Sequence, residues 1–351
     1  MIIKNARLED GIFDILIENG LIKDIGIFDG DDIVDAEGKR VIPGMIDTHI
    51  HGFGGYDTSD NELEKISVCL AKQGTTTWYP TTMTDSHDNL KRITSFETHV
   101  NGAVIPGFHL EGPYISKLKK GAQNEAYIKL PDLKGFSEYK NVKKITLAPE
   151  LDGAVEFIKN VDCVVSIGHT ACDYDEATKA IKAGATCLTH TFNAMPPMLH
   201  REPGPIGAGA ENGIYAELIC DGRHIHKAAV LALFSMFGKD RIVLISDTIR
   251  PAGLPDGKYS SGGLDVFVRD GVITLEGGVL AGGSTPLLGC VKKAVSFGID
   301  FYDAVRAATE NPARLMGLNK GRIEKGCDAD LVIINDDITV SSVIIGGKRF
   351  C

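Results

Sequence analysis

The sequence lacks the features that would assign it to a secreted or a membrane protein. No uninterrupted apolar stretch is long enough to cross a bilayer, and the N-terminus lacks the basic and then apolar pattern of a secretory signal. The eight cysteines are scattered without CxxC pairs, so neither a thiolate zinc site nor a disulfide framework is indicated. We therefore expect a cytoplasmic protein with reduced cysteines and no membrane partner.

Concentrated positive charge is also missing. The chain has 37 Lys and Arg against 47 Asp and Glu, which gives a net charge of −10. Because proteins that bind nucleic acid neutralise phosphates with clustered Lys and Arg, no nucleic-acid partner is expected. An anionic substrate would depend on a few local cations instead. With 351 residues, 43% of them hydrophobic, the chain is long enough for a full-sized barrel and a small second unit.

The two ends of the chain have the alternating pattern of β-hairpins. Residues 1–42 and 320–351 contain short alternating segments interrupted by turn dipeptides such as Asn19-Gly20 and Gly346-Gly347. This pattern predicts that the two termini meet in one small sheet domain.

The middle of the chain, residues 43–319, alternates short β-branched runs with helical patterns, which is typical of repeated βα units. Eight strands are expected, the number that closes a TIM-type (β/α)8 barrel. Helices are expected at 62–73, 174–183, 226–237 and 301–309. A Gly-rich stretch at about 254–283 predicts an insertion with a hairpin after the eighth strand. The expected strands are 44–49, 75–81, 104–110, 144–148, 163–168, 185–190, 214–219 and 242–246.

Residues of the kinds that bind metals occur at the C-terminal ends of five of these strands. In a barrel this end carries the active site, so the side chains are expected to converge although they are far apart in sequence. Each one alone could be a buried core histidine or a solvated acid, but together they indicate a site for one or two divalent ions. Zinc, iron, manganese and cobalt all suit such ligands. The set is His49, His51, Glu111, His169, His190 and Asp247.

Several segments together resemble the N-acetylglucosamine-6-phosphate deacetylases of the amidohydrolase superfamily. The similarity runs in order through almost the whole chain. It implies a metal-dependent enzyme, a barrel with a small β-sandwich made from both termini, and a homodimer. The segments are PGMIDTHIHG, GFHLEGP, IGHT, THTFNAM, REPG, CDGRHIH, SDTIRPAGLPDG and NPARLMGL.

The resemblance also implies roles for the metal-type residues. Glu111, His169 and His190 match the ligands that the family always uses, and the pair His49 and His51 matches ligands of a second ion in some members. The fourth strand ends in Leu-Ala-Pro-Glu without the lysine that bridges two metals in many relatives of the superfamily, so Glu111 is expected to bridge. Asp247 matches the catalytic aspartate. It is expected to take a proton from water that the metal has made acidic and to return it to the leaving amine.

A second set matches substrate contacts of the family. In this set Arg201 is expected to bind phosphate, and the family draws that arginine from a partner subunit; its alternative is an ion pair with Glu202. Gln123 falls where many members have a histidine that polarises the substrate carbonyl, and glutamine can donate a hydrogen bond there but carries no charge. The set is Ala122, Gln123, Asn193, Ala194, Arg201, His224, Leu280, Ala281 and Gly282.

The sequence therefore predicts hydrolysis of the acetamide of N-acetylglucosamine 6-phosphate to glucosamine 6-phosphate and acetate. One alternative is a deacetylase for another N-acyl amino sugar, such as N-acetylgalactosamine 6-phosphate, or for an N-acyl amino acid. Another is a catalytically inactive barrel that only binds, whose expected mark is the loss of metal ligands. None of the six ligands is missing. His226 is expected to have a structural role, such as capping a helix.

Overall fold

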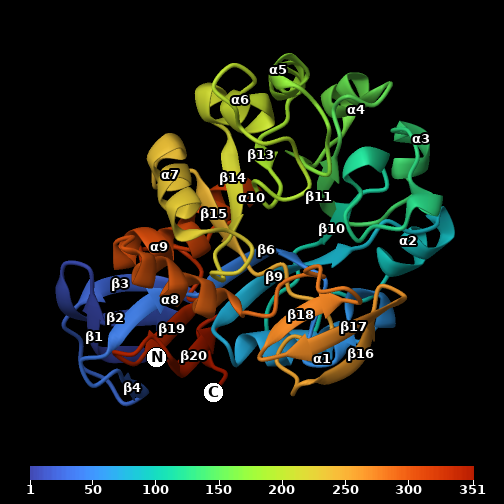
Figure 1. Cartoon of the computed structure of the whole chain (residues 1–351). Helices are drawn as coiled ribbons and strands as arrows, with labels where there is room; N and C mark the ends of the chain where they lie inside the picture. The colour runs from blue at the N-terminus through green and yellow to red at the C-terminus, as the bar shows by residue number, and fades with distance from the viewer.

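The computed structural model describes all residues from Met1 to Cys351, and a sheet of eight parallel strands forms its centre (Figure 1). All eight predicted strands are present, and each pairs in parallel with its neighbour in chain order. The predicted α/β barrel fold is thereby confirmed. The strands are β6 (Met45–Ile50), β9 (Thr75–Thr82), β10 (Phe108–Glu111), β11 (Val142–Leu147), β12 (Val164–Ile167), β13 (Cys187–Leu188), β14 (Tyr215–Ile219) and β15 (Ile242–Ile245).

The first and last strands of this sheet meet just beyond their C-terminal ends. The amide of Asp247 donates to the carbonyl of His49 at 3.0 Å, and the amide of His51 donates to the carbonyl of Thr248 at 2.8 Å. These hydrogen bonds join the segment after β15 to β6 and thus close the barrel. They also bring two candidate metal ligands of the first strand next to the candidate ligand that follows the eighth.

Helices cover the outside of the barrel (Figure 1). The four helices expected from the sequence are confirmed as α1, α5, α7 and α9 with ends shifted by at most two residues. None of the helices is both long and apolar enough to cross a membrane. The helices are α1 (Leu63–Ala71), α2 (His87–Ile93), α3 (Leu133–Phe136), α4 (Ala154–Asn160), α5 (Tyr174–Ala183), α6 (Gly204–Asn212), α7 (Lys227–Phe237), α8 (Leu287–Phe297), α9 (Phe301–Ala308) and α10 (Glu310–Met316).

The two ends of the chain form one separate sheet, as the alternating patterns predict, and both termini lie in this part of the molecule (Figure 1). The turn between β2 and β3 is Asn19-Gly20, with φ of 53° and 79°, as a tight hairpin of this type requires. The limits of the two units, at residues 42 and 320, stay a prediction. The strands are β1 (Ile2–Leu8), β2 (Gly11–Glu18), β3 (Leu21–Gly26), β4 (Ile33–Asp35), β5 (Arg40–Pro43), β19 (Leu331–Ile334), β20 (Val340–Ile345) and β21 (Lys348–Arg349).

Strand β19 connects the terminal sheet to the barrel because both of its faces are buried. Leu331 and Ile333 belong to the core of the terminal sheet, whereas Val332 and Ile334 pack in the large core of the barrel. Successive side chains of a strand point to opposite faces, so four consecutive apolar residues serve two cores at once.

The Gly-rich stretch after β15 forms a sheet of three antiparallel strands rather than the single predicted hairpin. These are β16 (Gly257–Ser261), β17 (Leu264–Arg269) and β18 (Val272–Leu275). Its return segment is attached to the barrel, since the amide of Gly283 donates to the carbonyl of Asp247 at 2.7 Å. A Cβ at position 283 would lie 2.0 Å from the carbonyl oxygen of Ser246, so only glycine permits this approach.

A buried ion pair holds the terminal sheet against the barrel. Lys320 is 7% exposed and Asp330 is 3% exposed, and the Lys320 ammonium lies 2.7 Å from Asp330 Oδ2. The same ammonium reaches Thr77 Oγ1 of β9 at 3.2 Å, and Asp330 Oδ1 accepts from the amide of Gly346 at 2.7 Å.

We predict that Asp330→Ala lowers the free energy of unfolding by about 3 kcal/mol, the lower end of the cost of breaking a buried pair, because it leaves the Lys320 charge with only the more exposed Asp328 carboxylate at 3.6 Å. Denaturant unfolding measures this, with the exposed and unpaired Asp31→Ala as the control, for which a change below about 0.5 kcal/mol is expected. Equal stability of the two variants would contradict the structural role of the ion pair.

Candidate active site

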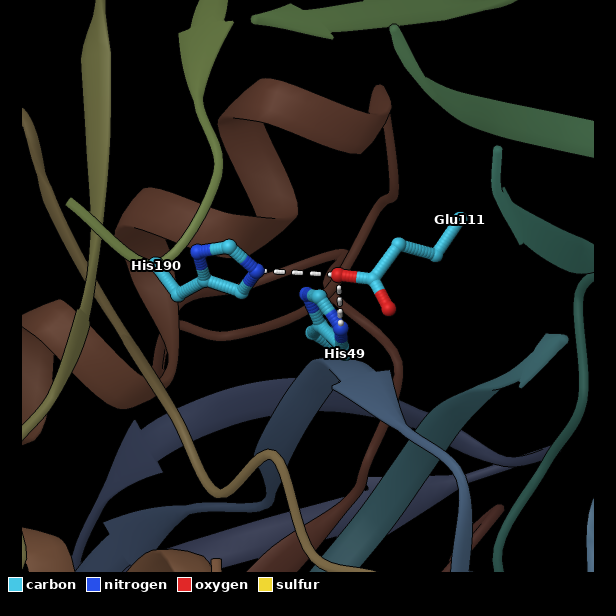
Figure 2. Close-up of side chains that lie close together, drawn as sticks. All are labelled: His49, Glu111 and His190. Carbon is cyan, nitrogen blue, oxygen red and sulfur yellow. Dashed lines mark hydrogen bonds and ion pairs between the residues drawn. The ribbon is translucent and has the colours of Figure 1, made fainter. Parts of the chain in front are cut away.

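Four imidazoles surround the carboxylate of Glu111 at the C-terminal end of the barrel. Its Oε1 lies 3.2 Å from Nε2 of His49, 3.2 Å from Nε2 of His169 and 2.9 Å from Nε2 of His190. Its Oε2 lies 3.2 Å from Nε2 of His51. Figure 2 shows that His49 and His190 approach the same carboxylate oxygen from different strands. Glu111 is thus in direct contact with residues up to 79 positions away in the sequence.

Asp247 completes the cluster and approaches the same nitrogen of His49 as Glu111 does. Its Oδ1 lies 3.4 Å from Nε2 of His49 and 3.5 Å from Nε2 of His51. Two groups of three ligand atoms each lie within 4.8 Å of one another, namely His49 with Glu111 and His190, and His49 with His51 and Asp247. The six residues predicted as metal ligands are therefore all brought together.

The histidines of the cluster direct Nε2 inward because Nδ1 is held by an oxygen acceptor. Nδ1 of His51 lies 3.1 Å from the carbonyl of Thr81, and Nδ1 of His169 lies 2.8 Å from the carbonyl of Lys119. A carbonyl can only accept, so the proton resides on Nδ1 and the Nε2 lone pair is free to bind a metal. His190 is the exception, since its Nδ1 has no acceptor within the protein.

The electrostatics of the cluster favour a bound cation. Burial lowers the pKa of His49 and His51, but the carboxylates Glu111 and Asp247 outweigh it and raise the pKa to about 9 and about 10. Burial raises the pKa of Glu111, but the charges of His49 and His169 lower it well below its usual value. The two carboxylates therefore attract positive charge into the site, either as protons or as a metal ion. Imidazole nitrogens and carboxylate oxygens are suitable ligands for a divalent transition metal.

Three residues of the cluster have backbone conformations that side chains rarely adopt. The φ angles are 45° for His169, 27° for His190 and 47° for Asp247. Left-handed backbone in residues other than glycine costs free energy and is concentrated at functional sites. The turns after β12, β13 and β15 thus aim these three side chains at the barrel axis.

The cluster forms the floor of a cavity of about 200 Å³. Met83, Gly121, Ile219 and Ile249, which were not predicted, also line the cavity. His49 lies beneath the floor, and Arg201 lies elsewhere. Every other predicted site residue lines the cavity: His51, Glu111, Ala122, Gln123, His169, His190, Asn193, Ala194, His224, Asp247, Leu280, Ala281 and Gly282.

Gln123 is held in one orientation by two opposite contacts. Its Oε1 accepts from the amide of Thr84 at 2.6 Å, and its Nε2 donates to Glu111 Oε2 at 2.5 Å. The glutamine therefore supports the central carboxylate, in addition to facing the cavity as the resemblance implies.

His224 is oriented by an acid that was not predicted. Its Nδ1 lies 2.7 Å from Asp221 Oδ2, and the amides of Arg223 and His224 donate to Asp221 Oδ1. Burial lowers the pKa of His224, but the contact with Asp221 outweighs it and raises the pKa. The cationic form of His224 is thus favoured at the wall of the cavity.

Arg201 lies outside the cavity in an open hollow of about 650 Å³, beside Pro196, Pro197 and Leu199. Its side chain donates to His200 Nε2 at 2.6 Å and does not pair with Glu202. Within one chain Arg201 is therefore separate from the metal cluster.

Other histidines and cysteines have structural environments. His226 caps α7, as expected, by accepting from the amide of Ala228 at 3.2 Å. His109 is fully buried under His49 and lies between the hydroxyls of Thr81 and Thr146. Burial raises the pKa of the Cys172 thiol to about 12, so this cysteine is an apolar core residue although it lies near His169.

Glu150 was also not predicted. It accepts from Thr170 Oγ1 and from the amide of Ala171, both at 2.6 Å, and so supports the turn that follows His169. The only signal for Glu150 in the sequence is that an acid lies close to the end of the fourth strand.

Comparison with known proteins assigns the class. Residues 40–350 match the model of the amidohydrolase family, so the chain belongs to this family. It is 37% identical to an N-acetylglucosamine-6-phosphate deacetylase of Bacillus subtilis, over 88% of this chain and 84% of the relative. It is 33% identical to an N-acetylgalactosamine-6-phosphate deacetylase of Escherichia coli O157:H7, over 90% and 89% of the two chains.

A solved structure has the same fold. A mutant N-acetyl-D-glucosamine-6-phosphate deacetylase of Mycobacterium smegmatis, in complex with N-acetyl-D-glucosamine-6-phosphate, superimposes with a TM-score of 0.92 at 32% identity and covers 99% of this chain and 98% of its own. The resemblance drawn from the sequence motifs is confirmed by these relatives.

We predict that the purified protein contains up to two divalent ions per chain and that His51→Ala loses one of them. His51 belongs to only one of the two groups of ligands, so the ion at Glu111 and His190 should remain. Elemental analysis measures the metal content, with the exposed His99→Ala as control. Chelation should lower the unfolding temperature, and returned zinc should restore it, because the metal binds only the folded state. Identical metal content in both variants would contradict the assignment.

Proposed function

We propose that this chain hydrolyses the acetamide of N-acetylglucosamine 6-phosphate to D-glucosamine 6-phosphate and acetate, as a step of amino-sugar catabolism. The observation that carries this proposal is the cluster of four imidazoles and two carboxylates at the floor of one cavity. The walls of that cavity carry Asn193, Ala194 and His224, which match the family's contacts to the sugar phosphate. Relatives at 32–37% identity that have this activity support it.

One or two divalent ions are proposed as the cofactor. Glu111, His169 and His190 would hold one ion, and His49, His51 and Asp247 would hold the second, with Glu111 between them. Such an ion, when bound, lowers the pKa of a water molecule towards neutrality and polarises the acyl oxygen of the substrate. Zinc, iron, manganese and cobalt all suit these ligands.

Asp247 is the proposed proton carrier. Its side chain is 14% exposed, so it faces the cavity, while its Oδ1 remains beside His49 and His51. Burial raises the pKa of Asp247, but the charges of His49 and His51 lower it, so the carboxylate is ionised and can accept a proton. We propose that it takes the proton of the attacking water and delivers it to the amide nitrogen, because an amine is too basic to leave unprotonated.

The substrate is positioned from the walls of the cavity. His224, held by Asp221 and favoured in its cationic form, is proposed to bind phosphate. The loop 280–282, anchored to the backbone of Asp247 through Gly283, would lie along the sugar. Gln123 would add a neutral hydrogen bond to the acyl oxygen.

Arg201 is proposed to act in the neighbouring subunit of a homodimer. It is exposed, lies outside the cavity of its own chain, and follows a loop with the exposed apolar side chains Met198 and Leu199. A guanidinium presents paired donors that suit phosphate.

The protein is further proposed to act in the cytoplasm.

A second candidate substrate is N-acetylgalactosamine 6-phosphate. The relative from Escherichia coli O157:H7 that bears this name is 33% identical to this chain. The two sugars differ only in the configuration at one hydroxyl, and both would present the acetamide and the phosphate to the same residues. Parallel assays with the two phosphates decide between them.

We predict that Asp247→Asn lowers kcat by about 100- to 10,000-fold, the usual contribution of general acid–base catalysis. Substrate binding should persist, because the amide has the shape of the carboxylate but cannot take up the proton. Acetate release measures kcat, and the exposed Asp152→Asn serves as the control. Unchanged turnover would dismiss Asp247 as the proton carrier.

We further predict that the phosphorylated sugar is hydrolysed far more efficiently than N-acetylglucosamine. We also predict that Arg201→Ala raises KM for the phosphorylated sugar about 10- to 100-fold with little change in kcat. Loss of one charge-assisted contact costs about 1.5 to 3 kcal/mol, and about 1.4 kcal/mol corresponds to a factor of ten. The exposed Arg349→Ala is the control. Equal turnover of both sugars would overturn the phosphate assignment, and an unaltered KM would exclude Arg201.

A further inference from the structure

A buried group of charged and polar side chains lies directly beneath the metal cluster, and the proposed chemistry does not use it. Thr48 and His49 come from β6, Lys144 from β11 and Glu217 from β14. All four are 0% exposed. The Lys144 ammonium contacts Glu217 Oε1, and Thr48 Oγ1 donates to the same oxygen at 2.7 Å. The other oxygen, Oε2, faces Nδ1 of His49 at 3.5 Å.

The two carboxylate oxygens of Glu217 therefore have different hydrogen-bond partners. Oε1 takes both donors from one side, namely the ammonium of Lys144 and the hydroxyl of Thr48, which leaves Oε2 for the imidazole of His49. An ionised carboxylate can only accept hydrogen bonds. In the neutral imidazole, which is the form that binds a metal, the proton of His49 therefore resides on Nδ1. Nε2, which lies 3.2 Å from Glu111 and 3.4 Å from Asp247, is then left to bind the ion.

The ion pair with Lys144 keeps Glu217 in this accepting state. Burial favours the neutral acid, but the Lys144 ammonium in direct contact with Oε1 and the Thr48 hydroxyl that donates to the same oxygen favour the anion. A neutral carboxylic acid could present a proton to His49, whereas the anion cannot. Lys144 therefore not only balances the charge of Glu217 but also determines which oxygen of Glu217 faces His49.

His49 differs in this respect from the other histidines of the cluster. His51 and His169 direct Nδ1 to backbone carbonyls, which no substitution removes. His49, which belongs to both groups of candidate ligands, depends on a side chain. Its acceptor can therefore be exchanged by mutation while the backbone stays intact.

We propose that Glu217 is a positioning residue that fixes His49 as the metal-binding tautomer, and that Lys144 fixes the orientation of Glu217. This inference rests on the proposed role of His49 as a metal ligand. Acceptors behind metal-bound histidines typically change metal affinity by about 10- to 100-fold when they are removed.

The test begins with Glu217→Gln, which keeps the size of the side chain. Lys144 and Thr48 both require an acceptor, so the amide oxygen should take the Oε1 position and the amide NH2 should face Nδ1 of His49. That donor would force the histidine proton onto Nε2, where it competes with the metal. We expect zinc affinity to fall about 10- to 100-fold and the zinc content after gel filtration to drop by one ion per chain.

Two double variants separate tautomer control from loss of the ion pair. In Lys144→Met/Glu217→Gln the ammonium is gone, so the amide can turn its oxygen towards His49, and zinc affinity should recover towards the wild-type value. In Lys144→Met/Glu217→Met the acceptor is missing, so affinity should stay low. Both lack the buried charges and have similar volumes, so they are a matched pair whose folding can be compared by circular dichroism.

Zinc content and a competition titration against a chelating dye are the readouts, and neither depends on turnover. Recovery in the Met/Gln variant but not in the Met/Met variant supports the proposal. Equal zinc affinity of the two double variants, or wild-type affinity in Glu217→Gln, would overturn it. A wild-type protein that holds only one zinc ion would overturn the two-ion site proposed above, and this role of Glu217 with it.

Discussion

The contact between buried carboxylates and buried imidazoles is the interaction on which the rest of the site depends. Glu111 has only 3% of its side chain exposed, and an isolated anion at such a place would cost several kcal/mol. The surrounding imidazoles offset part of that cost, and a bound metal ion would offset the rest. The site is therefore assembled around negative charge, and the positive φ angles at His169 and His190 accompany imidazoles that lie against the Glu111 carboxylate.

Closure of the barrel gives this charge cluster its geometry. The hydrogen bonds between the backbone at His49 and His51 and the segment at Asp247 and Thr248 are also the last contacts that complete the ring of strands. The backbone hydrogen bonds that complete the barrel thus also position the candidate metal ligands. Beneath it, the ion pair of Lys144 with Glu217 joins β11 to β14 across the interior, and these two strands contribute no candidate metal ligand.

Much of this arrangement could be predicted from sequence because it follows local rules. Strand ends in a parallel barrel share one face, so Glu111 after an apolar run could be placed together with the other metal-type residues at strand ends, although its position alone also suits a solvated acid. Helix α6 (Gly204–Asn212) was not anticipated because its three interior and terminal glycines disfavour helix. Gly209 is required there, since a Cβ would lie 2.9 Å from Leu188. Such a reason is visible only in three dimensions.

The residues that were missed share a physical explanation. Glu217 lies inside an apolar strand, and nothing in its local sequence reveals that Lys144 and His49, which are 73 and 168 positions away, become its partners. Asp221 and Glu150 lie in turns, where acids are common without a function. The separation of Arg201 from the cavity likewise depends on the path of the chain after His190, which no spacing rule describes.

Gln123 is a neutral residue at a position where the resemblance implies a histidine, and its contacts show what a neutral side chain can do there. Its Oε1 is taken by the amide of Thr84, so both hydrogens of Nε2 are available to the cavity side. One is donated to Glu111, and the other faces the sulfur of Met83 at 3.8 Å. A thioether is a weak acceptor, so a substrate carbonyl can replace it at little cost, while the bond to Glu111 persists. Under the proposed function, the glutamine would thus orient the central carboxylate and the acyl oxygen at the same time, and the positive charge that a histidine would supply would have to come from a bound metal.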